Sequence, residues 1–268
     1  MKQFSKRTAF SLVELSIVLV ILGLLVGGIL AGQSLIRASE LRAVTTEYHR
    51  YIAATYAFKD RYFALPGDFG DATRFWGRMS GNADCITLSA ATINSDGVCD
   101  GDGNGTLAPP AAANQSGEVF QYWRHLQKAG LLEGTYTGMS ESGGSMDSVL
   151  RVNIPASKVS TAGWNPFYYG TVNGNGSRYS ILYGNYFDFG AVSSVGPINK
   201  VLLPEEAWNI DSKMDDGKPA YGKVIARHWN NQCARPDDGV TFTNTNFASS
   251  YNLLDKTLQC ALMFRQIF

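Results

Sequence analysis

An apolar run near the N-terminus limits what this chain can fold into more than any other feature. The sequence from Phe10 to Ala31 holds about 22 residues, and Glu14 is the one charged residue among them. As an α-helix the run would extend about 33 Å at ~1.5 Å per residue, which is enough to cross the hydrocarbon core of a membrane. Three basic residues precede it, and such residues hold an N-terminus in the cytoplasm. The sequence therefore predicts one membrane span, to about residue 32, with the remainder outside.

The helical pattern continues beyond the apolar run. Apolar residues recur at steps of three and four from Leu35 to Phe63, while charged residues occupy the other faces. Pro66 is the first proline, so one helix is predicted over residues 10–61, with its second half packed on a globular domain. A secretory signal peptide is the alternative interpretation. The length of the run and the uninterrupted helix both argue against it.

Glu14 raises a separate question, because a carboxylate inside a membrane helix is costly. Insertion scales place the cost at about 2.5–3.5 kcal/mol at the centre of the helix. An acid in such a place is expected to have a partner and a role. A glutamate tolerated because it lies close to the membrane surface is the alternative.

The stretch KRTAFSLVELSIVLVILGLLVGG, residues 6–28, resembles the prepilin signal of type IV pilins and of the pseudopilins of type II secretion. The matching features are a basic leader, a small residue, and an apolar helix that opens with Phe and an isolated Glu. The resemblance implies cleavage between Ala9 and Phe10 by prepilin peptidase, followed by N-methylation of Phe10. The family usually has glycine where this chain has Ala9. The resemblance is strong over about the first fifty residues.

The resemblance also implies a role for Glu14 and a fold. In the family, the acid at this position neutralises the terminal amine of an adjacent subunit, so Glu14 is expected to select correct assembly. The implied fold class is α+β and pilin-like, with a long N-terminal helix, its first half transmembrane, on a mainly antiparallel sheet. The expected organisation is a leader over residues 1–9, the helix over 10–61 and the globular domain over 62–268.

Four glycines interrupt the apolar half of the predicted helix, at Gly23, Gly27, Gly28 and Gly32. Their spacing permits close approach of a second helix. Glycine also weakens a helix, by about 1 kcal/mol relative to alanine. In filaments of the family this part of the helix is often unwound. Local unwinding at Gly27–Gly28 and ordinary close packing of helices are therefore two alternative roles for these glycines.

The globular part begins with a turn and then favours β-structure. LPGDF at residues 65–69 is predicted to end the helix in a turn with a structural role, and it is similar to a stretch found in a large subgroup of pilin-like proteins. Short helices are predicted over residues 116–134 and 204–217, capped by Ser116 and opened by Pro204 respectively. Strands are predicted over residues 149–155, 165–172, 177–189 and 221–229 and in the C-terminal tail. His125 is expected to be structural.

A loop rich in Gly, Asn and Asp separates the first turn from the helix at 116–134. The pattern D-x-D-x-N-G at residues 100–105 matches the first half of a calcium-binding loop. The pattern is incomplete, because Ala111 occupies the twelfth position where an EF-hand has glutamate. Turn formation by the same residues is an equal alternative. The predicted ligands of a structural calcium ion are Asp96, Asp100, Asp102, Asn104 and Glu118. Asp211, Asp215 and Asp216 favour capping and turn formation over metal binding.

Four cysteines are consistent with disulfides in an oxidising compartment. None forms a Cys-x-x-Cys pair, which argues against a zinc finger. Pairing by proximity predicts Cys85–Cys99 and Cys233–Cys260, one of three possible connectivities. The second pair would resemble the C-terminal disulfide loop of type IV pilins.

Together these features predict a structural subunit of a type IV pilus or of a type II secretion pseudopilus. The expected partners are other pilins or pseudopilins, prepilin peptidase, the inner-membrane assembly platform and the membrane itself. Before assembly the chain would cross the inner membrane once, and afterwards it would lie in a periplasmic pseudopilus or a cell-surface pilus. A minor tip subunit with an adhesive or DNA-uptake role is one alternative.

A membrane-anchored periplasmic enzyme is the other alternative, and the sequence disfavours it. It lacks HExxH, GxSxG, a P-loop and any Cys–His pattern, so no catalytic residues are predicted and no cofactor is required. Nucleic-acid binding is disfavoured too. The whole chain has net charge +0, and three of its 23 basic residues belong to the leader, which leaves the mature chain slightly acidic.

Overall fold

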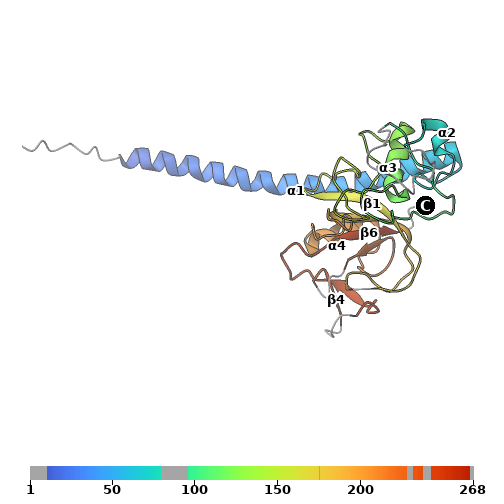
Figure 1. Cartoon of the computed structure of the whole chain (residues 1–268). Coiled ribbons are helices and arrows are strands. Elements are labelled where there is room, and N and C mark those ends of the chain that lie inside the picture. The colour runs from blue at the N-terminus through green and yellow to red at the C-terminus, as the bar shows by residue number, and fades with distance from the viewer. Residues whose placement is uncertain (1–10, 80–95, 175, 228–231, 238–242, 266–268) are drawn as a thin grey trace, which may run out of the picture. The chain divides into compact units, whose positions relative to one another are not determined.

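The structure is a computed structural model that describes residues 11–79, 96–174, 176–227, 232–237 and 243–265 (Figure 1). It divides into two units, residues 1–40 and 41–268, and helix α1 (Leu12–Tyr62) contributes to both. The second unit carries the other helices and all the described strands. The chain thus has the predicted α+β layout, a long apolar N-terminal helix and an antiparallel sheet domain.

Helix α1 confirms the helix predicted from periodicity. It continues through Gly27 and Gly28 and ends at Tyr62, four residues before Pro66. The sites that it buries in the second unit recur at helical spacing on one face. They are Val44, Tyr51, Ala54, Thr55 and Phe58.

Four strands form the main sheet, and every pairing in it is antiparallel. These are β1 (Ala162–Tyr169), β2 (Gly184–Ala191), β3 (Val224–Ala226) and β6 (Leu262–Arg265), in the order β1-β2-β6-β3. The C-terminal tail therefore supplies an inner strand, since β6 lies between β2 and β3. A second sheet pairs β4 (Ala234–Pro236) with β5 (Ser249–Tyr251).

One face of the main sheet packs against the second half of α1 through aromatic side chains. Tyr51 makes edge-to-face contacts with Trp123 and Trp164, at ring-centroid distances of 4.9 and 5.8 Å. Glu47, one turn earlier, accepts a hydrogen bond from Trp164 Nε1 at 2.9 Å and another from the Lys158 backbone N–H at 2.8 Å. Fully burying a large apolar side chain contributes about 1.5–3 kcal/mol, so this aromatic cluster stabilises the packing of α1 on the sheet.

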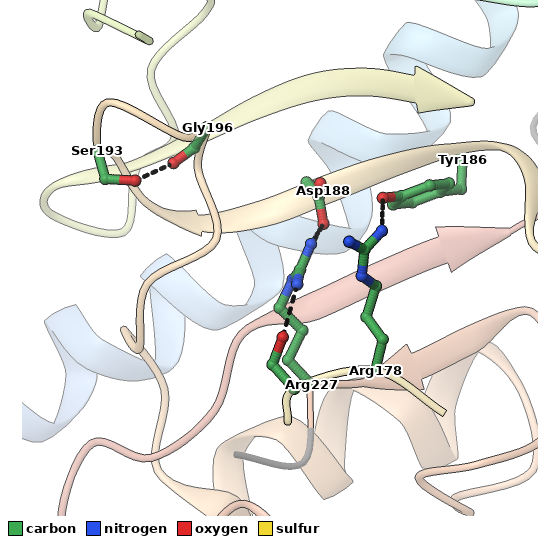
Figure 2. A network of polar contacts seen from close by, with 7 residues as sticks. Arg178, Tyr186, Asp188, Ser193, Gly196 and Arg227 are labelled. Carbon is green, nitrogen blue, oxygen red and sulfur yellow. Dashed lines mark hydrogen bonds and ion pairs between the residues drawn. The ribbon is translucent and has the colours of Figure 1, made fainter. Parts of the chain in front are cut away.

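The opposite face of the sheet carries tyrosines and a buried ion pair (Figure 2). Because side chains alternate along a strand, Phe187 and Phe189 join the α1-facing core while Tyr186 and Asp188 point the other way. Asp188 Oδ1 accepts from Arg227 Nη2 at 2.6 Å and Nε at 3.2 Å, and both side chains are buried. Arg227 Nη1 also donates to Ser177 Oγ at 3.1 Å, so the pair ties β2 to two loops.

Three short helices lie in the rest of the second unit, as far as its residues are described. They are α2 (Ala72–Trp76), α3 (Glu118–Lys128) and α4 (Pro204–Met214). Helices α3 and α4 confirm the two predicted short helices, and Pro204 is the first residue of α4 as expected. Gly130 and Gly217 follow the helix ends with φ of 72° and 71°, the left-handed region that glycine adopts without strain.

Some local predictions were wrong. Residues 149–155 form turns rather than a strand, because Arg151 adopts φ 63° and the chain reverses there. Residues 177–183 are also outside any strand, and the connection from β1 to β2 is longer than the predicted hairpin. Ser116 does not cap α3; its hydroxyl donates to the Gly138 carbonyl at 3.1 Å, and Gly117 is the N-cap residue.

Candidate functional site

The start of α1 is closed by a reciprocal pair of side-chain hydrogen bonds. The Glu14 carboxylate accepts from the Ser11 backbone N–H at 2.8 Å, and Ser11 Oγ accepts from the Val13 N–H at 3.3 Å. This S-x-x-E arrangement is a capping box, which satisfies N–H groups that the first turn of a helix leaves open. Glu14 therefore has an intrachain partner, which the sequence alone did not predict. Ala9 and Phe10, the predicted processing site, lie outside the described residues.

The first part of α1 presents apolar side chains on every side. From Leu12 to Ile36 its large hydrophobic residues are exposed, and an 18-residue window has mean hydropathy 2.7 with none of it buried. The helix is thus long and apolar enough to cross a membrane. A Cβ added at each of the four helix glycines, residues 23, 27, 28 and 32, would meet nothing within 4 Å in the described part of the chain beyond the adjacent helix backbone. No contact among the described residues requires these glycines, which leaves them available for close approach by another helix.

Three carboxylates meet in the loop region before α3. Ligand oxygens of Asp68, Asp102 and Glu118 all lie within 4.8 Å of one another. Glu118 is the first residue of α3, Asp102 comes from the D-x-D-x-N-G segment, and Asp68 comes from the LPGDF turn. Asp68 is buried, Glu118 is half-buried and Asp102 is exposed. The sequence predicted two of these three residues for a cation and missed Asp68.

Backbone N–H groups hold two of these carboxylates in place. Asp68 Oδ1 accepts from Gly103 and Asn104 at 2.6 and 3.2 Å, and its Oδ2 accepts from Gly105 at 2.7 Å. Glu118 accepts from the N–H groups of Asp102 at 3.1 Å and of Ala108 at 2.9 Å. The Gly-rich segment therefore wraps around the Asp68 carboxylate and fastens to the start of α3.

The other predicted calcium ligands have different partners. Asp96 forms an exposed ion pair with Lys128 at 2.5 Å. Asp100 accepts from the Thr73 N–H at 2.7 Å and the Thr73 hydroxyl at 2.9 Å, at the start of α2. Asn104 bonds to Asp102 and to Thr106 within its own turn. The structure thus does not bring the five predicted ligands together.

The clustering of acids perturbs their protonation. Burial, together with the carboxylates of Asp68 and Asp102, raises the pKa of Glu118 to about 7, although the hydrogen bonds from the N–H groups of Ala108 and Asp102 act in the opposite direction. Burial also raises the pKa of Asp68. Carboxylate oxygens suit a hard cation such as calcium, and a cation here would relieve this repulsion. The backbone N–H donors already offset much of the negative charge of Asp68, however. One proton on Glu118 is therefore sufficient to relieve the repulsion among the three carboxylates without a cation.

We expect a Glu118→Gln variant to reveal that proton. Between the ordinary pKa of 4.5 and the folded pKa of about 7, the folded chain holds a proton on Glu118 that the unfolded chain has released. Wild-type stability from this group is therefore present at low pH and lost as pH rises through about 7. The free energy of unfolding of wild type should exceed that of the variant by more at about pH 5.5 than at about pH 8. Tryptophan fluorescence of each chain in detergent follows the unfolding. A difference that does not change with pH would contradict the assignment.

The same comparison with added calcium tests the metal prediction. A bound cation would lower the pKa of Glu118, cancel the pH dependence and raise Tm for wild type but not for Glu118→Gln. Titration of His125 does not affect this comparison, because its contribution to the pH dependence of stability is the same in wild type and in the variant.

His125 links this loop region to the core. It is buried, its Nδ1 accepts from the Gly67 N–H at 2.9 Å, and its Nε2 lies 2.9 Å from the Cys99 carbonyl, to which it donates. Burial lowers the pKa of His125 to about 4, so it is neutral and fixed in one tautomer at neutral pH. The structure agrees with the structural role expected for this residue.

A second acidic group lies at the end of α4. Asp211 accepts from the Tyr251 hydroxyl at 2.8 Å and from the Gly217 N–H at 3.2 Å, and burial raises its pKa to about 7. Asp215 accepts from the N–H groups of Lys223 and Val224, and Asp216 from that of Lys218. These contacts support the predicted role in turn formation.

The C-terminal disulfide is confirmed. Cys233 and Cys260 are bonded to each other and both are buried. Cys99 is also disulfide-bonded, and its predicted partner Cys85 lies outside the described residues. The Cys233–Cys260 loop spans 27 residues and encloses the β4–β5 sheet.

Replacing both Cys233 and Cys260 by serine should lower the free energy of unfolding by about 3.5 kcal/mol, the chain-entropy value for a loop of this size. Urea titration of the full chain in detergent, monitored by tryptophan fluorescence, measures this loss. A free energy of unfolding equal to that of wild type would show that the buried bond adds no stability.

The chain matches no family model, no curated protein and no solved structure.

Proposed function

We propose that this protein is a filament subunit of the type IV pilin or pseudopilin kind, which assembles through helix α1. The observation that supports the proposal best is the contrast within this one helix. Residues 12–36 present large apolar side chains to their surroundings, whereas residues 44–58 bury one face in a folded unit. A helix that is apolar on all sides needs either lipid or other helices around it. Lipid would surround this part of α1 before assembly, and the helices of other subunits would surround it in the filament core.

Glu14 is proposed to select that transfer. In the membrane, its carboxylate is satisfied by its own helix start through the Ser11 N–H. After cleavage, a new amine on Phe10 would lie within a few residues of this carboxylate. Pairing between the Glu14 carboxylate of one subunit and the amine of another would neutralise both charges and set the stagger between helices. The capping box keeps Glu14 stable until such a partner arrives.

The fold and the remaining sites fit a structural role. A long helix whose second half lies on an antiparallel sheet is the layout of a pilin-like subunit. The proposal includes processing by prepilin peptidase, extraction by an inner-membrane platform and a final place in a pseudopilus or pilus. It requires no catalysis and no cofactor, and calcium at Asp68, Asp102 and Glu118 would be a structural addition.

A minor tip subunit with an adhesive role is the second candidate. Its support is size, since a mature chain of about 260 residues is large for a repeating shaft subunit. The abundance of this chain in filaments, relative to that of the main shaft subunit, would distinguish a minor tip subunit from a repeating one.

Cell fractionation tests the proposal. Filaments sheared from cells, or pulled from the periplasm by an antibody against the globular unit, should contain the full mature chain alongside other filament subunits. A chain present in membranes but absent from every filament preparation would favour the anchored-enzyme alternative.

A further inference from the structure

The peptide bond between Asn104 and Gly105 lies in an exposed turn of the loop before α3. When glycine follows asparagine, the glycine nitrogen can attack the asparagine side chain, because glycine has no side chain of its own to shield that nitrogen. The sequence holds three Asn-Gly pairs, and the structure describes both residues of two of them, Asn104–Gly105 and Asn173–Gly174. Both asparagines are exposed, so the contacts around each pair decide how readily it reacts.

A buried carboxylate lies at the proton of the Gly105 nitrogen. The Gly105 N–H donates to Asp68 Oδ2 at 2.7 Å, and Asp68 is 4% exposed. Burial raises the pKa of Asp68, so its carboxylate takes up a proton more readily than an exposed aspartate does. Asp68 is therefore positioned as a general base for this nitrogen. The Gly174 N–H donates instead to the Ser180 hydroxyl at 3.0 Å, and a neutral hydroxyl is a far weaker base.

Two hydrogen-bond donors lie at the side-chain carbonyl of Asn104. Its Oδ1 accepts from the Thr106 N–H at 2.7 Å and from the Thr106 hydroxyl at 2.6 Å. Donors at this oxygen stabilise the negative charge that develops when a nitrogen adds to Cγ. Asn104 Nδ2 donates to Asp102 Oδ2 at 2.6 Å, which holds the amide nitrogen away from Thr106. Among the described residues, the side-chain carbonyl of Asn173 has no such donors.

We propose that Asn104 is a site of self-modification, at which the Gly105 nitrogen attacks the side-chain Cγ and displaces the amide nitrogen. As the N–Cγ bond forms, the proton of the Gly105 nitrogen passes to Asp68. The Cγ–Nδ2 bond then breaks, and the amide nitrogen takes up that proton and leaves as ammonia. The product is a cyclic imide between residues 104 and 105. Water, which reaches this exposed turn, opens the imide to aspartate or to isoaspartate. The chemistry uses no oxidant and no reductant.

The modification would alter the carboxylate group formed by Asp68, Asp102 and Glu118. The Asn104 amide donates a hydrogen bond to Asp102, and either product replaces that donor by a further carboxylate. Isoaspartate also lengthens the main chain between the N–H groups of Asn104 and Gly105, both of which donate to Asp68. Repulsion between like charges and the changed spacing therefore both weaken the attachment of the Gly-rich segment to Asp68.

Peptide mass spectrometry of the full chain, incubated folded in detergent at neutral pH, tests the proposal. It follows the gain in mass that replacement of NH2 by OH produces at each Asn-Gly pair. We expect Asn104 to convert severalfold faster than Asn173 in the folded chain. In urea, where the contacts of both pairs are lost, the two should convert at similar rates. Asn173 is the internal control, because it has the same neighbour and experiences the same conditions. Conversion of Asn104 at the rate of Asn173 or more slowly, in the folded chain, would overturn the proposal.

Two variants test the assigned base and the assigned donor. Asp68→Asn removes the carboxylate, and Thr106→Val removes the hydroxyl with little change in volume. Each should slow the conversion of Asn104 severalfold and leave that of Asn173 unchanged, with tryptophan fluorescence as the check that the variant is folded. If Asp68→Asn does not fold, Thr106→Val still decides, and unchanged conversion of Asn104 in that folded variant would contradict the proposal. Neither measurement involves filaments, so this proposal and the proposed function can fail separately.

Discussion

A Glu14→Gln variant should reach the membrane in normal amounts and yet be at least about tenfold depleted from filaments, since tenfold corresponds to about 1.4 kcal/mol. Glutamine can still accept the hydrogen bond from the Ser11 N–H, so the capping box and the helix start survive. What the variant loses is the negative charge. In the filament the amine of a neighbouring Phe10 would then be buried without a counter-charge, which costs about twice that energy on insertion scales of about 2.5–3.5 kcal/mol.

The choice of glutamine separates two roles that alanine would confuse. Glu14→Ala removes both the cap and the charge, whereas Glu14→Gln removes the charge alone. Quantitative immunoblots of sheared and membrane fractions give the ratio. If the glutamine variant assembles as wild type does while the alanine variant fails, Glu14 serves only as a helix cap.

Asp188→Ala should lower the free energy of unfolding by about 3–5 kcal/mol. The substitution leaves the Arg227 guanidinium buried, with a side chain 3% exposed and with Ser177 as its remaining side-chain hydrogen-bond partner among the described residues. Breaking a buried pair on one side costs far more than the pair itself contributes, because the remaining charge cannot return to water. Urea unfolding of the full chain in detergent, followed by tryptophan fluorescence, measures the loss.

Two further variants make this test specific. Asp188→Leu combined with Arg227→Met should be more stable than Asp188→Ala alone, because no unpaired charge remains. Glu205→Ala breaks an ion pair with Lys256 in which both side chains are more than half exposed, and should change stability by less than about 1 kcal/mol. Equal losses from Asp188→Ala and Glu205→Ala would contradict the importance of burial.

Local patterns predicted the helical part of the fold well. The three- and four-residue periodicity from Leu35 to Phe63 gives helix α1 nearly to the residue at its C-terminal end, because helix formation depends on neighbours within one or two turns. Pro204 likewise marked the first residue of α4, since its fixed φ suits a helix start. The C-terminal disulfide followed from spacing and from the family resemblance.

Contacts between distant segments were harder to predict. Asp68 was interpreted as part of a turn because its partners, such as Gly103, come 35 residues later in the chain. The β-rich stretch around Arg151 failed as a strand because the loop reverses direction there, which no local propensity records. Likewise, the five predicted calcium ligands share a segment but face different partners, since neighbouring side chains in an irregular loop diverge.

N-terminal mass spectrometry on the chain from filaments and from membranes is the most direct test of the filament-subunit proposal. We expect a mature chain that begins at N-methylated Phe10 and is found in the filament fraction. An intact leader through Ala9 in both fractions, with no mature chain in filaments, would contradict it.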